Sequence, residues 1–180
     1  MKQTLIALVE DKPGVLNRVA SLFRRRNFNI ESLTVGHSET PGVSRMTIVT
    51  DEEEMLRRNV IRANLYKMVN VIDVQDVTDT PCVVRETALI KIEADATTRG
   101  QVMDVTEMYR ARIVDVATDT LIIEVTGESD KIESLIDVLH PFGIVEIMRT
   151  GKVAMTRGTV KTRNGSTRTN GSNGKVSASS

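Results

Sequence analysis

Aromatic residues and cysteine are the scarcest parts of this sequence. Its 180 residues include no tryptophan and a single cysteine, Cys82. The aromatic residues are Phe23, Phe28, Tyr66, Tyr109 and Phe142. A packed core must therefore come from Val, Ile, Leu and Met, which an apolar fraction of 40% allows. A lone cysteine excludes an internal disulfide and a cysteine metal cluster, and it fits a reducing cytoplasm.

Long apolar runs are missing as well. The run from Leu5 to Val9 ends at Glu10 and is too short for the core of a signal peptide. No stretch approaches the length that crosses a membrane. We therefore expect a cytoplasmic protein without a membrane partner.

Acidic residues are missing from the C-terminal end. From Gly151 onward there are six basic and no acidic side chains, although the formal net charge of the chain is zero. The first 150 residues thus carry 18 basic and 24 acidic groups, a net charge of −6. A folded body with this charge is a poor candidate for binding nucleic acid.

The segment 159–180 is basic and rich in Ser, Thr, Asn and Gly. Val160 and Val176 are its only bulky apolar residues. Such a composition cannot offset the entropy of ordering, so we expect a disordered tail. A nucleic-acid-binding tail is the alternative, and it is disfavoured because the tail lacks aromatic residues for base stacking.

The hydrophobic pattern predicts the same order of elements twice, strand-helix-strand-strand-helix-strand. In the first half the predicted strands are 4–10, 29–36, 43–50 and 68–78, with helices at 14–26 and after the acidic run 51–54. In the second half the predicted strands are 87–94, 112–117, 121–126 and 144–149, with helices at 98–109 and 130–139. Pro41, Pro81 and Pro141 all fall at predicted boundaries.

This order is the ferredoxin-like plan, so we predict an α+β protein of two tandem βαββαβ units. The units are 1–79 and 80–158, with a linker at 79–81 and the tail at 159–180. Within the first unit we expect strand 29–36 at an edge of the sheet, with a bulge near Glu31 and Ser32. The second helix of that unit is expected to bury one face, made of Leu56, Val60, Ile61 and Leu65.

Residues suited to catalysis or metal binding are few and scattered. Cys82 has no histidine within thirty residues in sequence, and His37 and His140 fall in different units. His37 with Glu39 offers only two metal ligands on a loop. Gly14 stands without the spacing of a nucleotide-binding loop. We expect no catalytic site and no metal site in this chain.

A tight turn of four residues, Asp11 to Gly14, joins the first strand to the first helix. The free N–H groups at the start of that helix suit an anion. Gly14 permits a close approach to the backbone, and Asn29 offers both a donor and an acceptor. The ordinary alternative is that Asp11 simply caps the helix.

Two features favour a ligand over a simple cap. Asp11 and Asn29 are expected at corresponding ends of neighbouring elements, and the edge strand 29–36 needs a cover, which a second subunit commonly provides. The sequence therefore predicts a small zwitterionic ligand held at a seam between two copies.

The chain also resembles a known family. The resemblance is carried by Glu10-Asp11-Lys12-Pro13-Gly14-Val15-Leu16, by Asn27-Phe28-Asn29-Ile30-Glu31-Ser32-Leu33 and by Ser44-Arg45-Met46-Thr47-Ile48. These runs are similar to an ACT domain, and specifically to the small regulatory subunit of acetolactate synthase (acetohydroxyacid synthase). The likeness covers about residues 1–158 and is most specific in the first unit.

The resemblance implies a non-catalytic subunit that binds no cofactor itself. Its partner would be a large catalytic subunit that uses thiamine diphosphate, magnesium and FAD to condense pyruvate with a second 2-oxo acid. The small subunit would raise that activity and transmit feedback inhibition by valine, in the biosynthesis of valine, isoleucine and leucine. The effector would lie between the ACT domains of a homodimer.

The resemblance assigns the effector site to Asp11, Pro13, Gly14, Val15, Asn29 and Ile30. Asp11 departs from the family pattern, because Asn is common there, and a carboxylate accepts from an ammonium but cannot donate to a carboxylate. Two other classes stay open: a free-standing ACT-type amino-acid sensor acting on another target, and a small ferredoxin-like enzyme.

Overall fold

The computed structural model describes residues 2–158, so the predicted tail 159–180 lies outside the described residues. The first unit runs β1 (Gln3–Glu10), α1 (Val15–Arg25), β2 (Ile30–His37), β3 (Val43–Thr50), α2 (Met55–Tyr66) and β4 (Val71–Asp76). Its four strands form a sheet in the order β2-β3-β1-β4, with every pair antiparallel.

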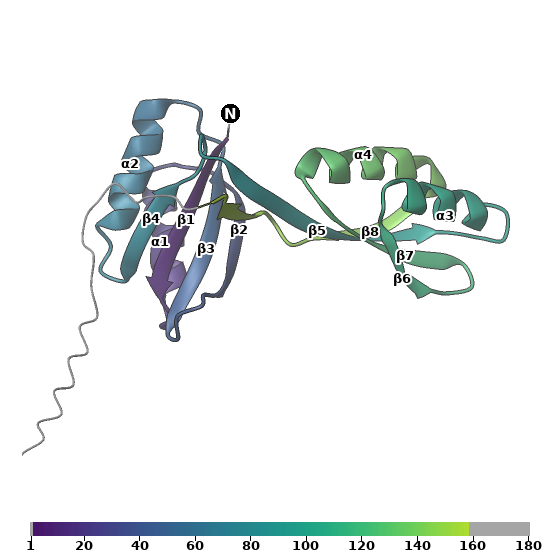
Figure 1. Cartoon of the computed structure of the whole chain (residues 1–180), viewed down its shortest axis with the longest axis horizontal. Coiled ribbons are helices and arrows are strands. Elements are labelled where there is room, and N and C mark those ends of the chain that lie inside the picture. Colours follow the sequence, from purple (N-terminus) through teal and green to yellow (C-terminus); the bar gives the residue numbers. More distant parts are fainter. Residues whose placement is uncertain (1, 159–180) are drawn as a thin grey trace, which may run out of the picture.

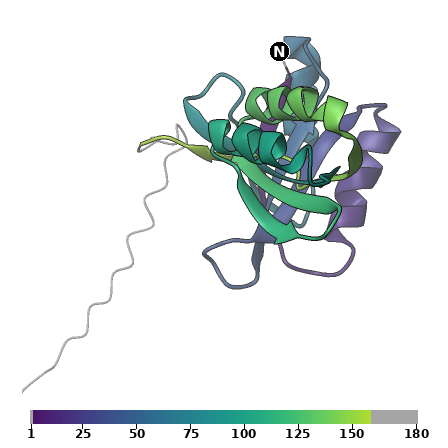
Figure 2. The same cartoon turned by 90° about the vertical axis from the view of Figure 1, so that its right-hand side faces the viewer.

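The second unit repeats this order. It runs β5 (Cys82–Glu93), α3 (Arg99–Met108), β6 (Arg112–Val116), β7 (Thr120–Gly127), α4 (Ser129–Leu139), the 3-10 turn η1 (His140–Phe142), β8 (Ile144–Arg149) and β9 (Val153–Thr156). The strand order β6-β7-β5-β8 matches that of the first sheet, and α3 and α4 lie side by side on one face (Figures 1 and 2). The predicted pair of βαββαβ units is confirmed.

Alternating side chains explain each core. In β1, Leu5, Ala7 and Val9 are at most 1% exposed and face the helices, where they meet Phe23 of α1 and Leu65 of α2. In β5, Ala88, Ile90 and Ile92 are fully buried and do the same in the second unit. Both cores are almost entirely aliphatic, as the shortage of aromatic residues requires.

The helix α2 departs from prediction. Ile61 and Leu65 are buried, but Leu56 is 73% exposed and Val60 is 41% exposed, so the predicted four-residue face was wrong. Residues 61 and 65 are one turn apart and fix the inward side, whereas Leu56 falls on the opposite side of the cylinder. An apolar residue on α2 is therefore not by itself a core residue.

A ribbon of two strands covers the second face of the first sheet. The first residues of β5, Cys82–Arg85, pair with β9. Ala154 in this ribbon is 4% exposed and packs with Ile6 and Val77, and the Arg45 guanidinium donates to the Ala154 carbonyl at 2.9 Å. In Figure 1, β5 continues from this ribbon into the second sheet. One strand thus belongs to both units.

Candidate functional site

The turn from β1 to α1 is built around Gly14. This residue has φ +84°, is the N-cap of α1 and has no heavy atom within 4 Å of the position a Cβ would take. No side chain caps the helix, so the alternative that Asp11 is its cap was wrong. Instead the Asp11 N–H donates to the Gly42 carbonyl at 2.9 Å, and the Asp11 carboxylate turns towards His37 at 3.6 Å.

The start of α1 keeps free donors beside this open position. The Val15 N–H donates to the Lys12 carbonyl at 3.3 Å, and the Arg18 N–H to the Gly14 carbonyl at 3.0 Å. Within residues 2–158, the N–H groups of Leu16 and Asn17 have no backbone acceptor. An exposed helix start with unpaired N–H groups and a glycine in front of it can hold a carboxylate.

Polar contacts fix the base of the turn. The Asn70 amide donates to Glu10 at 2.7 Å, and Lys12 lies 3.0 Å from the same carboxylate. These contacts, that of Asn70 first, lower the pKa of Glu10 below its usual value. The Arg18 guanidinium donates to the Asn70 side-chain oxygen at 2.7 Å, which ties α1 to the turn before β4. Pro13 is exposed at the tip, and Val15 is buried below it.

Asn29 and Ile30 lie elsewhere. Ile30 pairs with Thr50, which pairs with Gln3, at the start of β1. His37, at the far end of β2, pairs with Ser44 beside the end of β1. The expectation that Asp11 and Asn29 occupy corresponding ends was therefore wrong, because β1 and β2 run in the same direction. Seven residues of strand, roughly 23 Å, separate Ile30 from His37.

Within one chain, the six predicted residues thus form two groups. One group is Asp11, Pro13, Gly14 and Val15 at one end of the sheet, and the other is Asn29 and Ile30 at the other end. Asn29 is exposed, while Ile30 is half-buried against the core. The predicted bulge is confirmed, since the register of β2 shifts between Ile30 and Ser32.

The bulge also touches the second unit, a contact that sequence reasoning missed. Glu31 pairs with Lys2 at 2.8 Å and with Lys152 at 3.9 Å. The Lys152 N–H donates to the Ser32 hydroxyl at 2.9 Å, and the Thr34 hydroxyl donates to the Thr150 carbonyl at 3.2 Å. The contacts with Thr150 and Lys152 join residues more than 100 positions apart, and no local pattern in the sequence indicates them.

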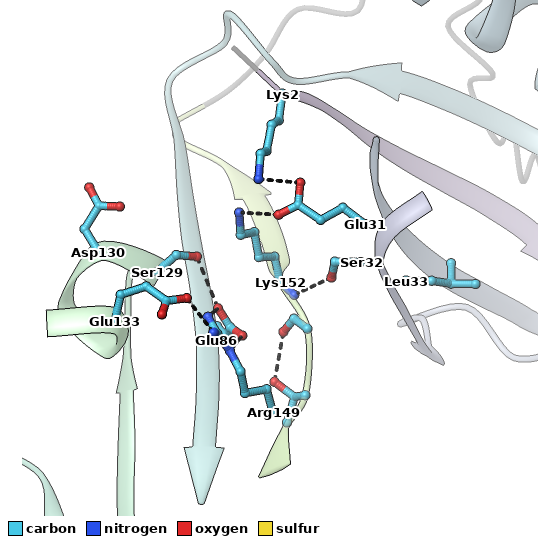
Figure 3. Close-up of a pocket in the computed structure, with 12 residues that line it drawn as sticks. Lys2, Glu31, Ser32, Leu33, Glu86, Ser129, Asp130, Glu133, Arg149 and Lys152 are labelled. Atoms are coloured by element: carbon cyan, nitrogen blue, oxygen red, sulfur yellow. Dashed lines mark hydrogen bonds and ion pairs between the residues drawn. The ribbon is translucent and has the colours of Figure 1, made fainter. Parts of the chain in front are cut away.

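A polar cavity of about 740 Å³ opens between these contacts and α4 (Figure 3). On its second-unit side, Arg149 donates to Glu86 at 2.5 and 3.0 Å and to Glu133 at 2.5 Å. The Ser129 hydroxyl donates to Glu86 at 3.1 Å. Arg149 is the main cause of the lowered pKa of Glu86, whose side chain is only 5% exposed. Apart from Asp130, the charged side chains that line the cavity are therefore paired with one another.

None of the described helices has the length and apolar character of a membrane span.

Comparison with known proteins assigns the family. The model for the "AHAS small subunit-like ACT domain" matches residues 5–73, and the model for the "small subunit of acetolactate synthase" matches residues 85–158. The probable acetolactate synthase small subunit of Archaeoglobus fulgidus is 51% identical over 161 residues, which is 89% of this chain and 100% of that one. The Bacillus subtilis acetolactate synthase small subunit is 46% identical, over 88% of this chain and 92% of its own.

A solved structure agrees. The acetolactate synthase small subunit of Thermotoga maritima superposes with a TM-score of 0.82 at 40% identity, covering 89% of this chain and 99% of its own. The chain therefore belongs to the family of acetolactate synthase small subunits, the regulatory subunits of that enzyme.

Proposed function

We propose that this chain raises the activity of the large catalytic subunit of acetolactate synthase and transmits feedback inhibition by valine. The large subunit would carry thiamine diphosphate, magnesium and FAD, and this chain none of them. Both subunits would work in the cytoplasm, in the biosynthesis of branched-chain amino acids. Residues 1–79 form the effector-binding and dimerising domain in this proposal, and residues 80–158 form the second domain.

The observation that carries the proposal is the separation of the two halves of the site. Asp11 and Gly14 lie at one end of the sheet and Asn29 and Ile30 at the other, so a single chain cannot close both around one small molecule. A second copy can. Because β2 is an edge strand, two copies can pair it antiparallel around Thr34, which sets Ile30 of one copy towards His37 of the other.

This pairing brings the two groups of site residues together at each end of the paired β2 strands. The Asp11–His37 contact of 3.6 Å shows that the turn lies beside the end of β2. Two equivalent sites result, each with Gly14 from one copy and Asn29 from the other. Pairing also covers Val35, which is 43% exposed at the edge although it sits on the helix-covered face of the sheet.

Each group in the site then has a task. The N–H groups at the start of α1 donate hydrogen bonds to the effector carboxylate across Gly14. Asp11 and the Asn29 side-chain oxygen hold the ammonium, since both can accept its hydrogen bonds. Val15, Ile30 and the ring of Pro13 supply apolar surface for a branched side chain. This division favours a small aliphatic amino acid, which fits the valine that the resemblance implies.

The test is acetolactate formation by reconstituted large and small subunits across a valine titration. Gly14→Asp puts a carboxylate where the effector carboxylate sits, so the valine concentration for half inhibition should rise roughly a hundredfold. Asn29→His removes the paired donor and acceptor and should weaken inhibition too. Both variants should still raise the activity of the large subunit.

Gly158→Asp is the matched control for Gly14→Asp. Gly158 also has a positive φ, +63°, and open space around it, but it lies far along the chain from the turn. It should keep wild-type inhibition. If Gly14→Asp and Asn29→His are inhibited like the wild type, the effector site lies elsewhere. Sedimentation at micromolar concentration should show no dominant monomer, and a monomer that still binds valine would remove the shared site.

The two other classes are distinguished by simple outcomes. A free-standing sensor would leave the large subunit unaffected and bind some other target in a pull-down. A small enzyme would turn over substrate without any partner. The family membership favours neither, because its members are subunits of acetolactate synthase.

A further inference from the structure

The helices of the first unit form a layer of one charge sign. Together α1 and α2 contain six arginines and no acidic residue, and Arg26 and Lys67 directly follow them. The equivalent helices α3 and α4 contain five acidic and two basic residues. Since the first 150 residues carry a net charge of −6, this positive layer runs against the charge of the body around it.

An open groove of about 440 Å³ crosses this layer between α1 and the turn that follows α2. Its cations are Arg18, Arg24, Arg25 and Lys67, and no carboxylate lines it. Among residues 2–158, no acidic side chain pairs with any of these four cations. Arg18 donates to the neutral amide of Asn70 instead. We call this the basic groove, and its potential favours an acidic ligand.

Large apolar side chains are exposed along α2 and in the turn that lines the basic groove. The exposed ones are Met55 at 69%, Leu56 at 73%, Tyr66 at 60% and Val69 at 91%. On α2 they lie away from Ile61 and Leu65, which hold the helix to the core. In Figure 1, α2 lies on the side of its sheet that faces away from the second unit, so nothing in the described chain covers this patch.

The size of this surface points to a protein rather than to a small anion. The twelve residues of α2 extend roughly 18 Å, and exposed apolar side chains lie along that length. An inorganic anion in the basic groove would leave all of them in water. Exposed apolar side chains beside a groove of cations without acidic partners are typical of a protein interface.

Two other faces of the first unit are accounted for. The ribbon of β5 and β9 covers the open face of the sheet. The edge of β2 is the face assigned to the second copy. The basic groove lies between α1 and the turn that follows α2, and none of the residues that line it belongs to β2. Docking here therefore leaves the proposed dimer intact.

We propose that the basic groove and the exposed side of α2 bind an acidic segment of the large catalytic subunit, with apolar side chains that meet Tyr66 and Val69. This inference rests on the proposed function, which supplies the partner. The acidic groups would pair with Arg24, Arg25 and Lys67. Valine at the dimer seam and the large subunit at α2 then act on the same domain from different sides.

The test measures the concentration of this chain that gives half-maximal activation of the large subunit. Arg24→Glu/Lys67→Glu reverses two exposed charges in the basic groove, and the half-activating concentration should rise at least about tenfold at low salt. Raising the salt should weaken activation by the wild type and affect the variant less, because screening removes an attraction that the variant lacks.

Arg110→Glu/Arg112→Glu is the matched control, since it reverses two exposed arginines of the second unit. Its half-activating concentration should stay within about twofold of the wild type. Val69→Asp is a second, independent variant at a side chain that is 91% exposed, so its folding is not at risk. It places a carboxylate against the acidic segment and should weaken activation like the double variant.

The outcomes separate this inference from the proposed function. If the wild type neither binds nor activates the large subunit, the proposed function fails and the docking surface fails with it. If the wild type activates and both groove variants match it, the docking surface alone is wrong. A photo-crosslinking residue at position 69 should capture an acidic peptide of the large subunit, and capture of a second copy of this chain would overturn the assignment.

Discussion

A partly buried polar pair joins the first and last strands of each unit, at the same place in the two sheets. In the first unit the Gln3 amide donates to Asp76 at 2.6 Å, and in the second unit Arg149 donates to Glu86 at 2.5 and 3.0 Å. Asp76 pairs with the residue two after Gln3, and Arg149 with the residue two after Glu86. Donor and acceptor have exchanged strands, and only the second pair has a cation.

The exchange changes how completely the pair is satisfied. Both oxygens of Glu86 accept hydrogen bonds, from Arg149 and Ser129. In the first unit, the Gln3 side-chain oxygen and the Thr50 hydroxyl are fully buried and have no hydrogen-bond partner among residues 2–158. The same topology thus accommodates a fully hydrogen-bonded ion pair in the second unit and buried polar atoms without partners at the equivalent position of the first.

The two sheets also differ on the face away from their helices. The first sheet is covered there by the ribbon, with Ala154 against Ile6. The second sheet leaves Leu89 at 37% and Met148 at 66% exposed on that face. Because β5 forms part of both the ribbon and the second sheet, residues of the second unit complete part of the core of the first unit.

Arg149→Met should have the largest effect on stability. It leaves the Glu86 carboxylate buried without its cation, which should lower the free energy of unfolding by about 3 kcal/mol and the melting temperature by roughly 6–12 °C. Glu133→Gln is the control, because Glu133 is the exposed partner of the same arginine, and it should cost under about 1 kcal/mol. Urea unfolding followed by circular dichroism measures both. Equal losses in the two variants would contradict a special role for Glu86.

The pH dependence sharpens this prediction. Since the pKa of Glu86 is lowered in the folded protein, its ion pair stabilises fully above the ordinary value of 4.5 and is lost as the pH falls through the folded-state value. The difference in unfolding free energy between wild type and Arg149→Met should therefore be greatest near neutral pH. It should shrink in acid, beginning above pH 4.5, because burial without the cation raises the pKa of Glu86 in the variant. A difference that does not change in acid would mean that Glu86 is not the group involved.

Ala154→Asp should have the next largest effect, because Ala154 packs on the sheet face that is covered in the first unit and open in the second. Its carboxylate must either stay buried beside Ile6 and Val77 or push β9 off the sheet, so we expect a loss of about 2 kcal/mol. Leu89→Asp, on the open face of the second sheet, should cost under about 1 kcal/mol. Hydrogen exchange of the β9 amides reports which way the first variant relaxes. Equal losses would show that the two faces are equivalent.

The local sequence pattern was enough to predict the helices and strands. It failed where the structure depends on contacts with a segment that is distant in sequence. The order of strands and helices, the edge position of β2 and the bulge after Ile30 follow from alternation and turn residues close in sequence. The ribbon was missed because four residues of β9 carry no signal until they meet β5. Leu56 was placed in the core because an apolar residue suits either a core or a partner's surface.

The candidate site shows the same limit. The turn at Gly14 and its free N–H groups could be predicted, since they depend on four consecutive residues. The distance from Gly14 to Asn29 could not, because it depends on the register of three strands. The contacts of Glu31 and Ser32 with Lys152 depend on how the units pack, which no stretch of sequence encodes alone.

Gly151→Ala tests the contact between residues 150–152, which join β8 to β9, and strand β2 of the first unit. Gly151 has φ +80°, and a Cβ there would lie 2.6 Å from the Ser32 hydroxyl and 2.9 Å from that of Thr34. We expect a loss of about 1–2 kcal/mol from backbone strain and displaced hydroxyls. Gly100→Ala in α3 is the matched control, with open space and a helical backbone, and should stabilise by about 0.5–1 kcal/mol. We expect thermal unfolding to show changes in stability of opposite sign for the two variants. A stabilised Gly151→Ala would mean that residues 150–152 do not pack tightly against β2.

Thr50→Val should have the smallest effect and the opposite sign to the first two predictions. The hydroxyl of Thr50 is buried without a hydrogen-bond partner in the described chain, so a methyl of nearly the same shape removes the cost of desolvating it. We expect a gain of about 0.5–1 kcal/mol, or a melting temperature higher by roughly 1–4 °C. Gly127 occupies the position in the second sheet that is equivalent to Thr50. Because glycine has no side chain to hydrogen-bond there, the gain is specific to the first unit. A loss on Thr50→Val would mean that the hydroxyl bonds the Gln3 side-chain oxygen in solution, and the two units would then be equally well satisfied.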